Sequence, residues 1–108
     1  MKKTILLLAV IILTAGGAAA KDTNASLRVQ GKCNMCKTKI EKAAKAVEGV
    51  SVAEWNKETK VLRLRFDDSK AKLDNISQAV AKIGYDTDKD KAPDEAYSAM
   101  PNCCKYRE

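Results

Sequence analysis

The sequence of 108 residues contains no histidine, and aromatic residues make up only 5% of it. The lack of imidazole excludes the histidine ligands of common zinc sites and the histidine base of hydrolytic triads. The scarcity of aromatic rings among the basic residues excludes a platform on which nucleic-acid bases stack. Sulfur from four cysteines is therefore the one strong ligand type that the chain offers to a soft metal ion.

Beyond residues 1–20 the chain has no long apolar run. Lys2 and Lys3 precede an apolar stretch at residues 4–14, and alanines at residues 18–20 provide a small-residue cleavage site. This order predicts a secretory signal peptide at residues 1–20, and the apolar stretch is too short to cross a membrane, which takes about 20 residues. We therefore expect a mature chain that begins at Lys21, is exported to the periplasm or another extracytoplasmic compartment, and has no stable membrane insertion after cleavage.

The mature part alternates between the periodicities of strands and helices. Apolar and polar residues alternate in the predicted strands, and apolar residues recur every three or four positions in the predicted helices. The predicted elements are a short strand at residues 27–29 after a loose polar leader at 21–25, a helix at 36–48, a strand at 50–56, a turn at 57–59, a strand at 61–66, a helix at 73–83 and an edge strand at 85–91. This order predicts an α+β, ferredoxin-like βαββαβ fold, with an antiparallel sheet and two helices on one face.

The end of the chain has a different character. Residues 93–108 contain both prolines, show no clear periodicity and carry the adjacent pair Cys103 and Cys104. The prediction is therefore one domain at residues 21–92, followed by a cysteine-containing tail at residues 93–108. The stretch between the domain and the tail cysteines could span about 40 Å if extended, so it is long enough to reach the other cysteines.

Cys33 and Cys36 lie where the first predicted strand gives way to the first predicted helix. The free N–H groups and the dipole of a helix start stabilise negative charge, so we expect a thiolate to be favoured at Cys36. Two thiolates at this spacing can hold one soft ion, such as copper(I), mercury(II) or zinc(II). A closed zinc site takes four ligands, so this pair alone suits an ion of lower coordination number better.

The cysteine loop and the segments around it resemble a known family. The Cys33-x-x-Cys36 pair after a first strand, the helix CKTKIEKAAKAVEGV, the strand VLRLRFD and the ending AVAKIGYDTD are similar to heavy-metal-associated domains, the fold of copper chaperones and of the periplasmic mercury-binding protein. The resemblance spans residues 26–91. It implies that Cys33 and Cys36 are the metal ligands and that Tyr85 lies beside them. The family usually has a methionine two residues before the first cysteine, where this chain has Gly31.

Four other residues are candidates for the same site. Lys32 and Lys37 flank the cysteine pair, where their charge would offset that of a bis-thiolate complex and could dock an acidic partner. Cys103 and Cys104 are further candidate ligands, because a tail that folds back would add a third or fourth thiolate. The same two thiols could instead cross-link with the first pair, bind metal separately or bridge a dimer.

Three classes of function fit this pattern. The first is an exported carrier without enzyme activity, which binds copper(I) or mercury(II) through Cys33 and Cys36 and exchanges it with a metal-donor or metal-acceptor protein such as a membrane transporter. The second is an exported thiol-disulfide oxidoreductase that uses the same pair, although the chain lacks a Cys-Gly-Pro-Cys loop and a parallel sheet. The third is a small domain stapled by disulfides. The sequence favours the carrier.

Overall fold

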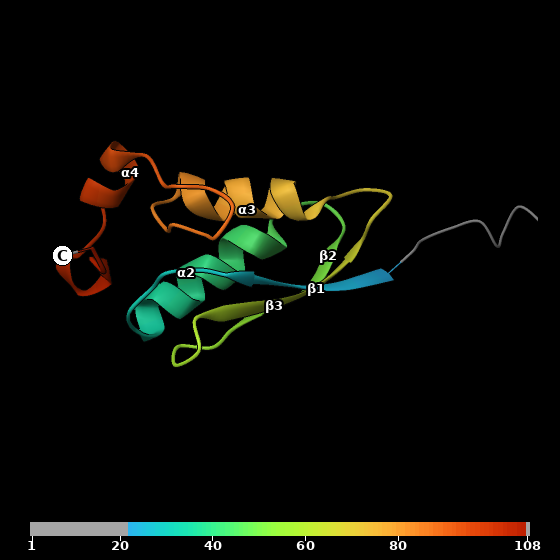
Figure 1. Cartoon of the computed structure of the whole chain (residues 1–108), viewed down its shortest axis with the longest axis horizontal. Helices are drawn as coiled ribbons and strands as arrows, with labels where there is room; N and C mark the ends of the chain where they lie inside the picture. Colours follow the sequence, from blue (N-terminus) through green and yellow to red (C-terminus); the bar gives the residue numbers. More distant parts are fainter. Residues whose placement is uncertain (1–21, 108) are drawn as a thin grey trace, which may run out of the picture.

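The computed structural model describes residues 22–107, and the predicted signal peptide lies outside them. The elements are β1 (Asp22–Arg28), α2 (Asn34–Lys45), β2 (Val50–Trp55), β3 (Val61–Asp67), α3 (Leu73–Lys82), α4 (Asp94–Ser98) and the short 3₁₀ helix η1 (Asn102–Cys104) (Figure 1). No helix in this described part is both long and apolar enough to cross a membrane.

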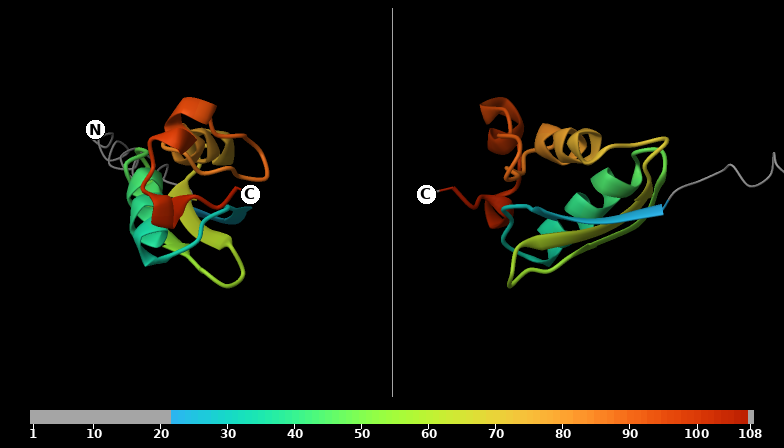
Figure 2. Two further views of the ribbon diagram at one scale, coloured as in Figure 1. Left: turned by 90° about the vertical axis from the view of Figure 1, so that its left-hand side faces the viewer. Right: turned by 45° about the vertical axis from the view of Figure 1, so that its right-hand side comes forward.

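The central strand of the sheet is β3, which pairs antiparallel with β1 on one side and β2 on the other. Its side chains alternate, because Leu62, Leu64 and Phe66 are buried while Arg63 and Arg65 are exposed. One face of the sheet is therefore covered, and α2 and α3 lie on that face (Figures 1 and 2). This arrangement confirms the predicted α+β fold with two helices on one face of an antiparallel sheet.

The first strand is longer than the sequence indicated. Residues 21–25 were expected to be a loose leader, but β1 begins at Asp22, which is opposite Asp67, and Ala25 is opposite Leu64. Every second residue of β1 is at least partly buried, and two of these, Thr23 and Ala25, are small. Small or polar residues on the inner face give a weak alternation of hydrophobicity, which is why the prediction of a loose leader was wrong.

The predicted edge strand at residues 85–91 is reduced to one bridge between Val29 and Thr87. The Thr87 hydroxyl accepts hydrogen bonds from the N–H groups of Lys89 and Asp90. The backbone N–H of Thr87 donates to the Asp90 carbonyl at 2.8 Å. This turn bends the chain away from β1 directly after the bridge. The prediction of a strand over the whole segment was therefore wrong, although the segment starts beside the end of β1.

The tail is folded against the domain and belongs to the same core. Figure 1 shows α4 and the C-terminal segment at the end of the molecule where α2 begins, and η1 contacts α2. Met100 and Cys104 are buried with the core side chains of the domain. Gly84 has a φ of +116°, and a Cβ there would come within 2.8 Å of the Met100 sulfur. Glycine at this position therefore allows the positive φ of the turn and leaves the space that Met100 of the tail fills.

Trp55 fills the space next to Gly31. The indole ring is buried, and its N–H donates to the Val29 carbonyl at 3.0 Å. A Cβ on Gly31 would lie 2.9 Å from two atoms of this ring. The large side chain that the family usually carries at this position therefore has no room here, because Trp55 occupies it.

We predict that Gly31→Ala lowers the free energy of unfolding by about 1–3 kcal/mol, the usual cost of overpacking a core. The measurement is urea unfolding followed by the fluorescence of Trp55, the single tryptophan of the chain. Ser26→Ala, at an exposed position of β1, is the control and should change stability by less than about 0.5 kcal/mol. Equal stability of Gly31→Ala and the parent would show that the indole can move aside.

Candidate metal centre

The first cysteine pair lies at the start of α2. Cys33 is the N-cap residue, with extended backbone at φ −143° and ψ −179°, and its carbonyl accepts the first helical hydrogen bond from Lys37 at 3.0 Å. Cys36 lies in the first turn and is fully buried, whereas Cys33 is half-buried. The two Sγ atoms are 3.5 Å apart. The helix begins two residues earlier than predicted, so both thiols lie at its N-terminus.

The two thiols of this pair have different acidities. Burial raises the pKa of Cys33, but hydrogen bonds from the Cys36 N–H, the Cys36 thiol and the Met35 N–H outweigh it and lower the pKa to about 7. Burial raises the pKa of Cys36, and the N–H bonds that it receives do not compensate. The expectation of a favoured thiolate at Cys36 was therefore wrong. The thiol of the N-cap residue Cys33, not that of Cys36, accepts hydrogen bonds from the free N–H groups at the helix start, and these bonds stabilise its thiolate.

The tail brings its two cysteines to the same place. The Sγ atoms of Cys33, Cys103 and Cys104 all lie within 4.8 Å of one another. Cys104 is fully buried and Cys103 is exposed, with its sulfur 3.9 Å from that of Met35. All four cysteines are free thiols. The four predicted candidate ligands thus lie around Cys33, which is close to Cys36 on one side and to the tail pair on the other. We call these four residues the sulfur cluster (Cys33, Cys36, Cys103 and Cys104).

Tyr85 lies against the buried side of the sulfur cluster. Its side chain is fully buried, and its hydroxyl has no hydrogen-bond partner within the described part of the chain. Burial raises the pKa of Tyr85, and the neighbouring thiols of Cys104 and Cys36 raise it further. The tyrosine is thus a neutral O–H group beside two thiols. A role for it in metal binding stays a prediction.

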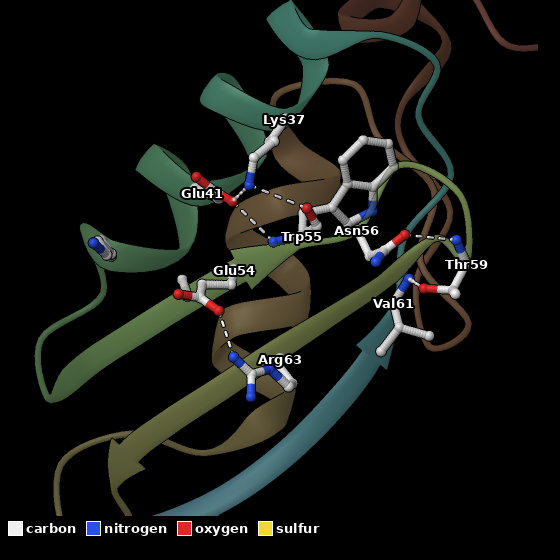
Figure 3. A pocket seen from close by; sticks show the side chains of 10 residues that line it. Lys37, Glu41, Glu54, Trp55, Asn56, Thr59, Val61 and Arg63 are labelled. Atoms are coloured by element: carbon white, nitrogen blue, oxygen red, sulfur yellow. Dashed lines mark hydrogen bonds and ion pairs between the residues drawn. The ribbon is translucent and has the colours of Figure 1, made fainter.

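The two candidate lysines make other contacts. Lys32 donates to the Lys105 carbonyl at 3.2 Å, which links the cysteine loop to the tail. Lys37 binds the carboxylate of Glu41 and the Trp55 carbonyl at 3.2 Å, and the same carboxylate accepts the Trp55 N–H at 2.9 Å. Figure 3 shows these three residues at a surface groove of about 740 Å³. Lys37 therefore ties α2 to β2, and an effect of either lysine on bound metal stays a prediction.

Sequence reasoning missed the contacts that hold the tail in place. The Tyr106 hydroxyl accepts the Asp86 N–H and donates to the Gly84 carbonyl, both at 2.7 Å. Arg107 binds the Asp86 carboxylate at 2.7 Å, and its guanidinium lies 4.4 Å from the ring centre of Tyr97. We call Asp86, Tyr97, Tyr106 and Arg107 the clasp. The available signal was the distribution of tyrosine, because all three tyrosines of the chain follow residue 84.

Comparison with known proteins agrees with this geometry. The model of the heavy-metal-associated domain matches residues 26–86. The mercuric transport protein periplasmic component of Shewanella putrefaciens is 34% identical over 84 residues, which are 77% of this chain and 92% of that protein. The copper chaperone CopZ of Staphylococcus epidermidis is 34% identical over 65 residues, which are 59% of this chain and 96% of that protein.

A solved structure extends the comparison to a transporter. The water-soluble region of the P-type ATPase CopA from Bacillus subtilis superposes with a TM-score of 0.59 and 26% identity, over 64% of this chain and 46% of that one. The three relatives are a periplasmic component of mercuric transport, a copper chaperone and the water-soluble region of an ATPase. The match of the family model to this chain ends at residue 86, directly after Tyr85. This chain belongs to the heavy-metal-associated domain family.

Proposed function

We propose that the protein is an exported carrier of one soft metal ion, copper(I) first and mercury(II) second, which Cys33 and Cys36 bind and exchange with a partner protein. The observation that carries the proposal is the pair of thiols 3.5 Å apart at the start of α2. Cys33 is partly exposed, and its pKa of about 7 makes much of it a thiolate near neutral pH. An incoming ion can therefore bind Cys33 first.

The geometry of the pair suits an ion with few ligands. A linear bis-thiolate complex needs sulfur atoms about 4.6 Å apart, twice a metal–sulfur bond of about 2.3 Å. Cys36 is fully buried, whereas Cys33 is only half-buried, so Cys33 is the side chain that can change its rotamer more easily. A rotation of its side chain that moves the sulfur by about 1 Å opens the pair enough. Each thiol releases its proton to water as its metal–sulfur bond forms.

The relatives support both the choice of ion and the class of partner. Two of them are named for copper or mercury, which are soft ions that thiolates prefer over hard cations. A relative within a P-type ATPase supports a membrane metal transporter as the donor or acceptor. Transfer needs an ion that a second pair of thiolates can reach, and the exposed side of Cys33 offers that access.

Export is part of the proposal and rests on the first 20 residues. Their order of lysines, apolar residues and alanines is typical of a secretory signal. The relative from Shewanella putrefaciens is named as a periplasmic component, which supports the same compartment. The protein would then bind metal that has already reached the space outside the cytoplasm.

A thiol-disulfide oxidoreductase is the second candidate. The observation that favours it is the pKa of about 7 at Cys33, which is close to that of the reactive cysteine in thioredoxin. An oxidoreductase turns over, whereas a carrier only exchanges its ion. The two functions therefore differ in an assay of catalysis.

We predict metal exchange without catalysis. In the first measurement, unlabelled copper(I)-loaded protein is mixed with isotope-labelled metal-free protein, and NMR follows arrival of copper at the labelled cysteine loop. Complete exchange within minutes is expected, because thiolate ligands substitute one another through a shared complex. In the second, insulin reduction by the protein with dithiothreitol should not exceed the background rate. Catalysis that disappears in both Cys33→Ser and Cys36→Ala would instead establish the oxidoreductase.

A further inference from the structure

The tail places two more sulfur atoms beside the pair that the proposed function uses. We propose that Cys103 and Cys104 are ligands as well, so that the sulfur cluster is a closed site with more than two thiolates for one soft metal ion. The inference rests on the proposed function, since it concerns the same ion. The inference goes beyond the proposed function because the matched family domain ends at residue 86 and contains neither tail cysteine.

The spacing of the sulfur atoms fits such a site. Around a tetrahedral ion with metal–sulfur bonds of about 2.3 Å, neighbouring sulfur atoms are about 3.8 Å apart. The Sγ atoms of Cys33, Cys103 and Cys104 already lie within 4.8 Å of one another, and Cys36 is 3.5 Å from Cys33. Cys33 is thus close to all three other thiols, and Cys36 and Cys104 both lie beside Tyr85. Four thiolates would also meet the ligand number of a closed zinc(II) site, which Cys33 and Cys36 alone do not.

Tyr85 supplies a second and independent observation. Among residues 22–107 the buried Tyr85 hydroxyl has no hydrogen-bond partner, which is rare in folded proteins, because such a group loses its bonds to water without replacement. The groups beside it are the thiols of Cys36 and Cys104. A metal-bound thiolate is a better acceptor than a thiol, so an ion held by these two sulfurs gives the Tyr85 O–H a partner. The unpartnered hydroxyl thus marks Cys104, as well as Cys36, as a ligand.

The tail needs little ordering to reach the ion. Docking a mobile segment costs chain entropy, which would weaken binding by a tethered ligand. Here Tyr106 and Arg107 already hold the tail to the loop at Gly84 and Asp86, and Cys104 is buried next to α2. The tail is therefore already ordered before metal binds, and binding causes little further loss of chain entropy. Additional tethered ligands of this kind raise binding by about 100-fold or more.

The experiment compares the full mature chain with Cys103→Ser/Cys104→Ala, each loaded with copper(I) and studied by X-ray absorption. Alanine replaces the buried Cys104 because a hydroxyl there would lack a partner. We expect more than two sulfur neighbours around copper in the parent and two in the variant, with an affinity for copper(I) lower by about 100-fold. Two sulfur neighbours in both proteins, with equal affinity, would overturn the inference and leave the proposed function standing.

Two further variants keep the result interpretable. Cys103→Ser changes an exposed side chain, so it should fold normally and still lose one sulfur neighbour. Asn102→Ala alters the same short helix without removing sulfur and should behave as the parent. If the parent itself fails to bind copper(I) against a competing chelator, the proposed function fails and this inference fails with it.

Discussion

Replacing Cys33 by serine and Cys36 by alanine should lower the affinity for copper(I) by more than about 100-fold. This factor is a lower bound. Removing a residue that only hydrogen-bonds to a metal ligand already lowers metal affinity by about 10–100-fold, and here the ligands themselves are removed. The chain has no histidine, so no imidazole can take over. The two remaining thiols, Cys103 and Cys104, lie within 4.8 Å of each other, but they are only half of the sulfur cluster, so an ion bound by them alone loses two of its thiolates. Competition with a chromophoric copper(I) chelator under anaerobic conditions gives the affinity.

The choice of substitutions follows from burial. Cys36 is fully buried, and alanine keeps that position apolar, whereas the half-buried Cys33 tolerates a hydroxyl. The control is Asn34→Ala, which changes an exposed residue at the start of α2 and should bind copper(I) like the parent. Circular dichroism checks that each variant is folded. Parent-like affinity in the double variant would place the metal site away from this pair and contradict the proposed function.

The fold was predictable wherever one face of an element is strongly apolar. The inner face of β3, with Leu62, Leu64 and Phe66 between arginines, indicates a strand with a single buried face, and the structure confirms it. Hydrophobic periodicity reports burial, so it fails where buried residues are small or polar. Thr23 and Ala25 on the inner face of β1 are such residues. The strand was missed for this reason.

Local side-chain bonds were the second source of error. Residues 85–91 have a composition that a strand tolerates, but the Thr87 hydroxyl caps a tight turn and ends the pairing with Val29 after one bridge. A hydroxyl that binds its own backbone competes with strand pairing. Sequence periodicity does not indicate whether the turn or the strand pairing forms.

The candidate site was predictable in its residues but not in its electrostatics. The spacing of Cys33 and Cys36 at a helix start indicated two thiols in reach of one ion, and the structure places them 3.5 Å apart. Which thiol is the more acidic depends on the residue at which the helix begins. It begins at Asn34, so the free N–H groups favour Cys33 and burial disfavours the thiolate of Cys36. A shift of two residues in a predicted helix start reverses this assignment.

The placement of the tail required contacts that no pattern indicates. A segment with two prolines and no periodicity is usually read as loose. Here its order depends on single interactions between distant residues, such as Tyr106 with Gly84 and Arg107 with Asp86. Such contacts leave no periodic trace in the sequence. The position of Cys104 in the sulfur cluster follows from them, which makes the clasp the part of the structure to test.

Arg107→Ala should open the tail and expose the amide of Cys104 to hydrogen exchange. Arg107 binds the Asp86 carboxylate and the Ala92 carbonyl and lies over the Tyr97 ring. Exposed ion pairs contribute up to about 1 kcal/mol, whereas breaking a buried pair costs about 3–5 kcal/mol. This pair is about a quarter exposed on each side, so we expect an intermediate loss of about 2 kcal/mol. That loss corresponds to a local opening about 30-fold more frequent.

Hydrogen exchange read by mass spectrometry measures this opening. The Cys104 N–H donates to the Pro101 carbonyl at 2.9 Å, so its protection reports the intact tail. The matched control is Arg63→Ala, an exposed arginine on the open face of the sheet that pairs with Glu54, and it should leave the protection of Cys104 unchanged. Equal protection in Arg107→Ala and the parent would mean that other contacts hold the tail.

The effect of Arg107→Ala should disappear in acid. Burial raises the pKa of Asp86, but the hydrogen bonds from Arg107 and from the Ala92 N–H outweigh it and hold the pKa below that of an ordinary carboxyl group. A lowered pKa means that the ion pair stabilises the tail fully above the ordinary value of about 4 and loses that contribution as the pH falls through the lowered value. Protection of Cys104 in the parent should therefore fall towards that of the variant in this acid range. A difference that persists there would assign the role of Arg107 to its stacking on Tyr97 instead of its charge.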